Sequence, residues 1–343
     1  MARSHFNSLA FAAFVPLWLA FVPAQADEAP VAEEPVFDAR LSGYAYPFEV
    51  HILALKSQRQ DLEMAYMYLP GKEDAPTVVL LHGKNFNGAY WRQTAEFLAS
   101  RGYGVLMPDQ IGFGKSSKPV AYQYSFNQLA ANTAVLMDAL GIKKAVIVGH
   151  SMGGMLAARF ALAYPERTRR LVLVNPIGLE DYLDYTTYPD ISAAFEREKA
   201  LTGADIVAYQ RKNYYDGAWS DAYDALTIPL RGWINGPDSE QLAYVSALTY
   251  DMILTQPVID DLERLAVPTT LIIGTRDRTG PNRANKRARV SRELGRYDRL
   301  GKDAASRIPD AQLIELDGLG HLPHIEDFGR FKDALLQALD AGQ

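Results

Sequence analysis

Apolar and polar positions follow two periodic patterns along most of this chain. Residues 48–56 and 62–69 alternate between apolar and polar side chains, which predicts two strands joined by a hairpin loop at 57–61. Residues 77–81 form a continuous apolar run, typical of a strand buried on both faces. Further strands are predicted at 103–107, 145–148, 171–174, 269–274 and 312–316.

Stretches with helical spacing separate these runs, at 90–100, 126–140, about 155–164 and 328–339. Such alternation indicates an α/β fold, a mostly parallel sheet with helices on both faces. It stops at 176–265, where helical stretches carry nine tyrosines. We therefore predict an α/β core formed by 43–175 and 266–343, with 176–265 as an inserted helical cap. A Pro-, Ala- and Glu-rich flexible lead-in is predicted at 27–42.

Residues 1–26 have the features of a cleavable signal peptide. Residues 1–8 contain one arginine and no acid, residues 9–23 are almost wholly apolar, and Ala24-Gln25-Ala26 is a small-x-small cleavage site. The apolar run is short for a membrane span, so an uncleaved anchor is the less favoured alternative. We predict cleavage after Ala26 and a periplasmic or secreted protein that is not inserted in the membrane.

The net charge and the absence of cysteine exclude some classes of partner and of catalytic chemistry. The 343-residue chain has a net charge of −6, which argues against nucleic acid as a partner. Loss of 26 residues and of the positive charge of Arg3 would leave 317 residues with a net charge of −7. Cysteine is absent, which excludes disulfides and thiolate chemistry.

The sequence Gly149-His150-Ser151-Met152-Gly153 stands where the 145–148 strand meets the next helix. It matches Gly-x-Ser-x-Gly, in which a sharp turn between strand and helix exposes a nucleophilic serine. The helix that follows directs its free N–H groups and the positive end of its dipole toward that serine. The alternative is an ordinary strand–helix turn that contains a serine, so the residues that would assist Ser151 decide between the two.

A serine hydroxyl needs a base to take its proton. His321 lies in the loop directly after the 312–316 strand, and the carboxyl ends of strands are where ligand chemistry collects in an open α/β sheet. We predict His321 as the base, with His324 as the alternative. A metal site built on these two histidines is a rival interpretation, but no carboxylate and histidine set of suitable spacing accompanies them.

The base must itself be oriented by a carboxylate. Asp277 follows the 269–274 strand and is predicted to take that role. Its alternative is a surface ion pair with Arg276 or Arg278. The equivalent position after the 171–174 strand holds Asn175, which has no charge.

Two N–H donors are needed for the oxyanion of a tetrahedral intermediate. We predict the backbone N–H of Met152, which follows the nucleophile, and that of Lys84, in the loop after the 77–81 strand. Asn85 and Phe86 are the alternatives to Lys84. His82 is predicted to brace this loop and not to act as an acid or base.

Together these motifs resemble the α/β-hydrolase superfamily, in its cap-bearing branch of esterases, C–C bond hydrolases, haloperoxidase-like enzymes, dehalogenases and epoxide hydrolases. The matching segments, in the order Ser, Asp, His, are His82-Gly83, the 108–116 loop, the Ser151 turn, 274–277, and 318–321 with Glu326 behind it. The resemblance implies a serine hydrolase of a small ester or related acyl substrate, with no metal or organic cofactor. Serine at the turn argues against dehalogenases and epoxide hydrolases, which place aspartate there.

Other interpretations stay open at this point. The same triad serves acyl transfer and C–C bond hydrolysis, and a binding protein could use the pocket without turnover. The aromatic cap indicates an apolar substrate, or else its tyrosines only pack the cap onto the core. Residues 276–302 carry ten Lys or Arg, which favours a solvated helix or a surface for anionic partners.

Overall fold

A computed structural model describes residues 1–2 and 34–340 of the chain. By its contacts the chain divides into Met1–Glu33 and Glu34–Gln343, and the fold reported below belongs to the second unit. The predicted signal peptide, apart from residues 1–2, lies outside the described residues. In the described part of the chain, no helix is long and apolar enough to cross a membrane.

The centre of the fold is a sheet of eight strands in the order β1-β2-β4-β3-β5-β6-β7-β8. The pairs β1–β2 and β2–β4 are antiparallel and every other pair is parallel, which confirms the predicted α/β architecture with a mostly parallel sheet. The strands are β1 (Val50–Ser57), β2 (Gln60–Leu69), β3 (Thr77–Leu81), β4 (Gly104–Pro108), β5 (Ala145–His150), β6 (Thr168–Val174), β7 (Thr269–Gly274) and β8 (Ala311–Leu316).

Each face of the sheet carries its own apolar core because successive side chains of a strand point to opposite faces. Val78 and Leu80 of β3 pack with α1 (Arg92–Ser100) and α12 (Phe328–Asp340) on one face. Val79 and Leu81 pack on the other face with α2 (Phe126–Ala139), α3 (Met152–Ala163) and α10 (Tyr297–Arg307). Burial on both faces explains why the central strands have continuous apolar sequences.

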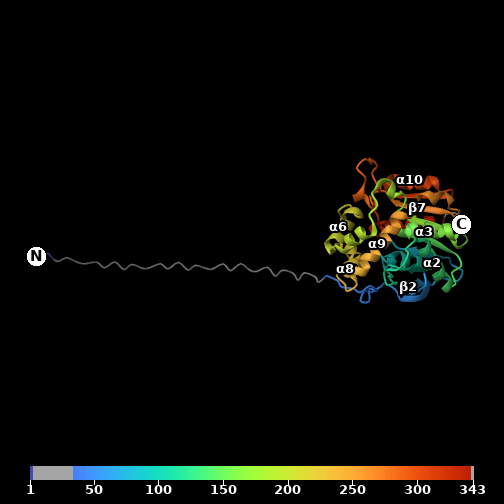
Figure 1. Cartoon of the computed structure of the whole chain (residues 1–343), viewed down its shortest axis with the longest axis horizontal. Helices are drawn as coiled ribbons and strands as arrows, with labels where there is room; N and C mark the ends of the chain where they lie inside the picture. Colours follow the sequence, from blue (N-terminus) through green and yellow to red (C-terminus); the bar gives the residue numbers. More distant parts are fainter. Residues whose placement is uncertain (3–33, 341–343) are drawn as a thin grey trace. The chain divides into compact units, whose positions relative to one another are not determined.

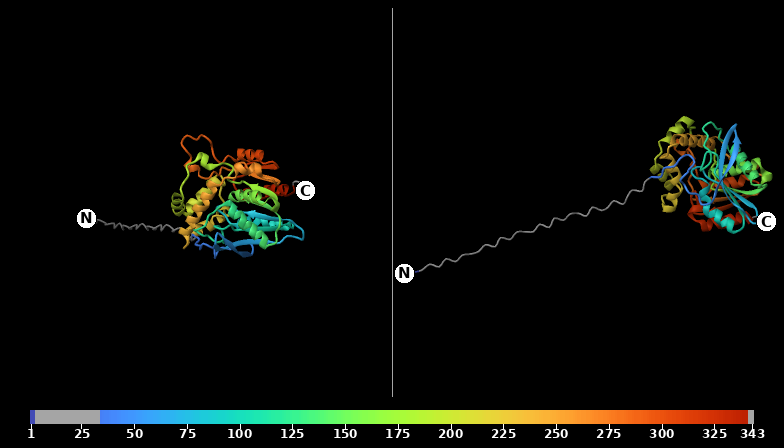
Figure 2. Two further views of the ribbon diagram at one scale, coloured as in Figure 1. Left: turned by 45° about the vertical axis from the view of Figure 1, so that its right-hand side comes forward. Right: turned by 90° about the horizontal axis from the view of Figure 1, so that it is seen from below.

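The segment predicted as a cap, 176–265, contains only helices among its regular elements. They are α4 (Tyr182–Tyr185), α5 (Ile191–Lys199), α6 (Gly203–Asn213), α7 (Asp221–Ala225), α8 (Ile228–Ile234), α9 (Ser239–Thr255) and the 3-10 helix η3 (Ile259–Arg264). Figure 1 shows α6, α8 and α9 together beside the sheet. The two views of Figure 2 keep these yellow to orange helices on one side of the α/β layers.

The prediction of a flexible lead-in is wrong for its last residues. Phe37 donates a backbone hydrogen bond of 2.8 Å to the Gly232 carbonyl, and the Leu41 side chain is fully buried. Glu34 forms an ion pair with Arg231 in α8 at 2.9 Å. The Phe37 backbone and the Glu34 carboxylate therefore attach this Pro- and Glu-rich segment to α8.

The basic stretch after β7 is also corrected, because most of it is loop and not helix. Regular structure in this region is confined to the short 3-10 helix η4 (Arg283–Asn285) and to α10. The buried carboxylate of Glu180 accepts hydrogen bonds from Gly295 N at 2.8 Å and Arg292 Nε at 3.1 Å. Asn282 donates to Thr186 Oγ1 at 2.8 Å. These contacts with the preceding helical region override the helical propensity of the sequence.

Candidate active site

Ser151 stands at the turn between β5 and α3 in a strained backbone conformation, with φ 56° and ψ −121°. A residue with a Cβ rarely adopts positive φ, and such strain is retained mainly at functional positions. Hydrogen bonds hold the turn on both sides: Ser151 N donates to Val174 O at 3.2 Å, and Ser151 O accepts from Gly154 N at 2.9 Å. The hydroxyl is thereby presented at the carboxyl end of β5, beside the N-terminus of α3.

The two glycines of the turn are required by close backbone approach. A Cβ on Gly149 would lie 2.5 Å from the Gly153 carbonyl carbon, and a Cβ on Gly153 would lie 2.6 Å from the Leu81 carbonyl carbon. Both distances are well inside van der Waals contact with backbone that cannot move aside. Glycine at these positions lets α3 pack directly against β5 and β3.

His321 lies between Ser151 and Asp277, three residues from distant parts of the sequence. Its Nε2 is 2.9 Å from Ser151 Oγ, and its Nδ1 is 2.7 Å from Asp277 Oδ2. With an ionised Asp277 as acceptor, the imidazole carries its proton on Nδ1 and leaves Nε2 free to accept the serine proton. The structure thus brings together the predicted nucleophile, base and orienting acid.

Asp277 is fully buried, and its carboxylate is held by neighbours as well as by His321. Thr279 N donates to Oδ1 at 2.7 Å and Asn175 Nδ2 donates to Oδ2 at 2.9 Å. The alternative of a surface ion pair is wrong, because Arg276 and Arg278 pair with other carboxylates. Asn175 occupies the position after β6 where an acid could also stand, and there it donates a hydrogen bond to Asp277, the acid after β7.

A chain of buried hydrogen bonds connects the β3 loop to the backbone of the base. Gly83 N donates to the Tyr90 oxygen at 3.1 Å, the Tyr90 hydroxyl lies 2.9 Å from His150 Nδ1, and His150 Nε2 lies 2.8 Å from the His321 carbonyl oxygen. With Nε2 as donor to that carbonyl, Nδ1 accepts from Tyr90. Burial holds the pKa of His150 well below its ordinary value, which keeps the ring neutral for this role.

The ring of His321 is also fixed from the helical region. Tyr214, just after α6, stacks on the imidazole at a centroid distance of 4.7 Å and an interplanar angle of 29°. The Tyr214 carbonyl accepts the His321 N–H at 3.4 Å. Sequence reasoning missed Tyr90, His150 and Tyr214 in these positioning contacts.

The predicted oxyanion donors lie on the two elements that flank Ser151. Met152 is the first residue of α3, where backbone N–H groups have no partner within the helix. Lys84 follows Gly83, whose added Cβ would be 3.2 Å from Ser151 Cβ. The alternative donor Phe86 already gives its N–H to the Gly83 carbonyl at 3.2 Å.

His82 joins the β3 loop to the loop after β4. Its Nδ1 is 2.9 Å from Gly83 O, and its Nε2 accepts from Gln110 N at 3.1 Å. Asp109, in the 108–116 motif, accepts from Gly88 N at 2.7 Å. The prediction that His82 braces this loop is confirmed.

With this geometry established, sequence comparison decides the family. The alpha/beta hydrolase fold family matches residues 76–328. The chain belongs to this family. The predicted resemblance is confirmed, since the matched range includes the strand–turn–helix at Ser151 and both partner residues, Asp277 and His321.

Three proteins illustrate what this α/β hydrolase is similar to. "Putative carbamate hydrolase RutD" of Pseudomonas syringae is 30% identical over 275 residues, which cover 76% of this chain and 93% of the relative. A 2-hydroxymuconate semialdehyde hydrolase of Pseudomonas putida is 28% identical over 71% of this chain and 81% of its own length. The crystal structure of a "probable hydrolytic enzyme" from Pseudomonas aeruginosa PAO1 matches with a TM-score of 0.87 and 46% identity, covering 89% of this chain and 99% of that one.

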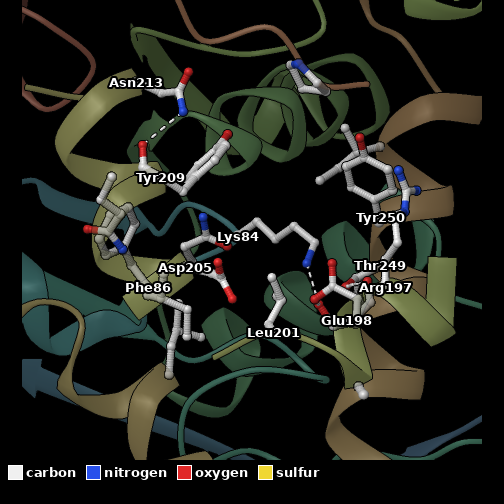
Figure 3. Close-up of a pocket in the computed structure, with 18 of the residues that line it drawn as sticks. Lys84, Phe86, Arg197, Glu198, Leu201, Asp205, Tyr209, Asn213, Thr249 and Tyr250 are labelled. Atoms are coloured by element: carbon white, nitrogen blue, oxygen red, sulfur yellow. Dashed lines mark hydrogen bonds between the residues drawn. The ribbon is translucent and has the colours of Figure 1, made fainter. Parts of the chain in front are cut away.

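The hydrolase encloses a cavity of about 950 Å³ whose wall includes Ser151. The wall is formed by the loop after β3, by α5, α6, α8 and α9, and by the loop after β7 (Figure 3). Only part of the aromatic set of the helical region faces it: Tyr209, Tyr214, Tyr250 and Trp233. Others pack in the core, such as Tyr182, so packing of the helical region onto the core accounts for only part of the aromatic set.

The side chain of Lys84 crosses this cavity to the helical region. Its Nζ donates to Ser246 Oγ in α9 at 2.6 Å, and that hydroxyl donates to Glu198 Oε2 in α5 at 2.6 Å (Figure 3). The charges of Lys84 and Glu198 therefore offset each other through a shared hydroxyl. This arrangement ties the loop that carries the predicted oxyanion donor to two helices of the segment above it.

His324, the alternative base, is buried and makes no hydrogen bond to Ser151. It stacks on Trp91 at a centroid distance of 4.5 Å, and neither of its ring nitrogens has a hydrogen-bond partner. Both nitrogens of His321 are engaged with Ser151 and Asp277, which argues against a metal shared by His321 and His324. In the described part of the chain, no group of three or more His, Cys, Asp or Glu is arranged to hold a metal ion.

We expect the buried neutral histidines to make the protein sensitive to acid. Burial lowers the pKa of His82 and His150, and lowers that of His324 to about 3 from its ordinary 6.5. Below pH 6.5 the unfolded chain therefore binds protons that the folded chain does not, and the free energy of unfolding falls as pH falls. Each such histidine contributes about 1.4 kcal/mol per pH unit until its folded pKa is reached.

The measurement is urea unfolding at a series of pH values between about 4 and 7, the range over which this linkage acts. A His324→Phe variant keeps a ring against Trp91 but cannot titrate. Its free energy of unfolding should depend on pH less steeply than that of the wild type, by about 1.4 kcal/mol per pH unit. Equal slopes for the two proteins would show that His324 is not neutral in the folded state.

Proposed function

We propose that this protein is a serine hydrolase that cleaves a small ester or related acyl substrate through an acyl-enzyme. The observation that carries the proposal is the placement of His321 within hydrogen-bond distance of both Ser151 Oγ and Asp277 Oδ2. These three side chains, each of which follows a different strand (β5, β7 and β8), meet in a buried site that opens to a cavity. A non-catalytic binding protein would have no need of this arrangement or of a strained serine at its centre.

In the proposed reaction Ser151 Oγ attacks the substrate carbonyl while His321 Nε2 takes its proton. The same nitrogen then gives that proton to the leaving alcohol, which completes the acyl-enzyme. His321 Nε2 next takes a proton from water, whose oxygen attacks the acyl carbon. The same nitrogen then returns this proton to Ser151 Oγ as the acyl bond breaks and the acid leaves. Asp277 holds the imidazole tautomer and stabilises the imidazolium, and the N–H groups of Met152 and Lys84 donate to the oxyanion.

Labelling with a fluorophosphonate tests the proposal directly, because this reagent phosphonylates activated serines. We expect the wild-type protein to be labelled on Ser151 and a Ser151→Ala variant to remain unlabelled. A denatured sample of the wild type is the control for non-specific reaction. Folded wild-type protein that takes up no label would refute the serine hydrolase.

The second candidate is hydrolysis of a C–C bond beside a carbonyl with the same three residues. It is favoured by the similarity to the 2-hydroxymuconate semialdehyde hydrolase, whose named substrate contains no ester bond. The two candidates differ in the leaving group, an alkoxide or a carbanion. A panel of p-nitrophenyl esters of increasing chain length decides between them: turnover of short-chain esters supports ester hydrolysis, and labelling without any ester turnover supports C–C cleavage.

We further propose that the chain is exported and cut after Ala26, on the basis of the apolar run and the Ala24-Gln25-Ala26 sequence. The mature enzyme would then work in the periplasm or outside the cell on a small-molecule substrate. Sequencing the N-terminus of the protein from its native host tests this. A first residue of Asp27 is expected, and a first residue of Met1 would refute cleavage.

A further inference from the structure

Three side chains of the cavity wall have buried polar atoms without a partner. They are Gln210, with both atoms of its amide, Thr279, with its hydroxyl, and Arg283, with Nε and Nη2. Buried polar groups in folded proteins are nearly always hydrogen-bonded, because an unmade bond costs the full desolvation of the group. Three such groups in residues that line one cavity mark this part of the wall as a candidate place for a polar ligand.

The three residues lie next to the catalytic residues. Thr279 donates its backbone N–H to Asp277, so its hydroxyl lies two residues from the orienting acid. Gln210 is one helical turn before Tyr214, whose ring stacks on His321 and whose N–H bonds to the Gln210 carbonyl at 2.8 Å. Because Ser151 lines the same cavity, we take a ligand group held here to be part of the molecule that reacts at Ser151.

Arg283 is positioned beside Thr279 by the fold of the loop after β7. A Cβ on Gly295 would lie 2.5 Å from the Thr279 carbonyl oxygen and 2.7 Å from Arg283 Nη2. Gly295 has a φ of +74°, so glycine is required there on two grounds, conformation and space. The loop thus leaves room for a guanidinium over the backbone at Thr279.

Among the residues that the structure describes, no carboxylate forms an ion pair with the guanidinium of Arg283, and its Nε and Nη2 have no hydrogen-bond partner. Glu293 lies near enough to be stabilised by Arg283, but its own ion pair is with Arg296 at 2.8 Å. Glu198, which also faces the cavity, is already joined to Lys84 through a shared hydroxyl. A partly buried guanidinium without a counter-ion favours an anionic ligand, and its planar fork matches a carboxylate.

We propose that Arg283, assisted by Thr279 and Gln210, binds a free carboxylate on the substrate, so that the preferred substrates are half-esters of dicarboxylic acids. This proposal rests on the hydrolytic function proposed above and specifies its substrate class. The guanidinium donates to the carboxylate, and the Thr279 hydroxyl and Gln210 amide supply further donors. The acyl chain between carboxylate and ester spans the apolar part of the cavity.

The test compares pairs of esters that differ only in a terminal carboxylate. Monomethyl succinate, glutarate, adipate and suberate are each compared with the methyl alkanoate of equal chain length, by pH-stat titration at neutral pH. We expect at least one half-ester to have a kcat/KM about tenfold or more above that of its neutral partner. The optimal chain length reports the span from Ser151 to Arg283.

Arg283→Met removes the charge and keeps much of the apolar stem. It should lower kcat/KM for the preferred half-ester by about 10- to 100-fold and change that for the neutral ester less than threefold. Arg283→Lys should fall between, because it keeps the charge but loses the fork. Arg289→Met, an exposed arginine of the same loop that does not line the cavity, is the matched control and should behave as the wild type.

Binding is measured separately, so that failure of the substrate class and failure of the proposed function can be told apart. Calorimetric titration of the Ser151→Ala protein with the dicarboxylate of optimal length, or with glutarate where no ester is turned over, requires no turnover. Binding that Arg283→Met abolishes supports the subsite. Absence of binding, or equal losses for charged and neutral esters in Arg283→Met, would overturn it. If the dicarboxylate binds but no ester is turned over, the result counts against the proposed ester hydrolysis and leaves the carboxylate subsite standing.

Discussion

Replacing His321 with alanine is expected to lower kcat for a p-nitrophenyl ester by about 10⁶-fold, close to the effect of removing the nucleophile itself. The reason is geometric: His321 Nε2 is the atom placed 2.9 Å from Ser151 Oγ to take its proton. Without His321 no base removes the proton of the Ser151 hydroxyl during its attack on the carbonyl. The remaining rate comes from substrate binding and the oxyanion donors.

The matched control for this variant is His324→Phe. Both histidines are buried in the same part of the structure, but His324 has no hydrogen-bond partner and stacks on Trp91. We expect kcat of His324→Phe to stay within about tenfold of the wild type, in line with a packing role. Stopped assays with purified, folded proteins would check both values. A severe loss of kcat in His324→Phe, with little loss of kcat in His321→Ala, would mean that His324 is the base and His321 the packing residue.

The positions of Ser151, Asp277 and His321 could be predicted because each follows a strand whose sequence is unambiguous. Parallel strands bring their carboxyl ends to one edge of the sheet, so residues that follow β5, β7 and β8 must lie near one another. The pair of glycines around Ser151 adds a backbone constraint that few other turns share. Local pattern and sheet topology were sufficient for this part of the site.

The contacts that position the base could not be predicted in the same way. His150 adjoins Ser151 in sequence, yet its ring points to Tyr90 and to the His321 carbonyl. This direction depends on which residues surround the end of β5 after folding. Glu326 likewise accepts the Gly320 N–H at 2.8 Å from the next helix along the chain. Such roles require the side-chain directions that only the folded structure supplies.

The loop after β7 shows a different limit of sequence reasoning. The ten basic residues of 276–302, which include the start of α10, favoured a solvated helix or an anion-binding surface, and both interpretations treated the arginines as equivalent. In the structure Arg292 pairs with the buried Glu180, whereas Arg283 faces the cavity without a counter-ion. The distinction depends on carboxylates that are remote in sequence. Composition alone therefore cannot distinguish one arginine of this segment from another.

Replacing Asp277 with asparagine is expected to lower kcat by about 10⁴-fold without loss of the fold. The substitution keeps the shape of the side chain. In the wild type, however, Asp277 Oδ2 accepts hydrogen bonds from both His321 Nδ1 and Asn175 Nδ2. An amide nitrogen in place of Oδ2 is itself a donor and cannot accept either of these two hydrogen bonds. It would favour the imidazole tautomer with its proton on Nε2, which cannot accept from Ser151. Circular dichroism and urea unfolding are the controls for folding.

A second substitution separates charge from position in this effect. Asn175→Asp, added to Asp277→Asn, places a carboxylate 2.9 Å from the former Oδ2 position, where it accepts from the new amide. The negative charge then lies one residue away from His321 and lowers the cost of forming the imidazolium, although the amide nitrogen still favours the wrong neutral tautomer, so only part of the lost rate returns. We expect the double variant to recover kcat by about tenfold over Asp277→Asn, because the restored attraction acts in a buried site. A double variant no faster than the single one would mean that His321 depends on direct contact with the acid and gains nothing from a nearby charge.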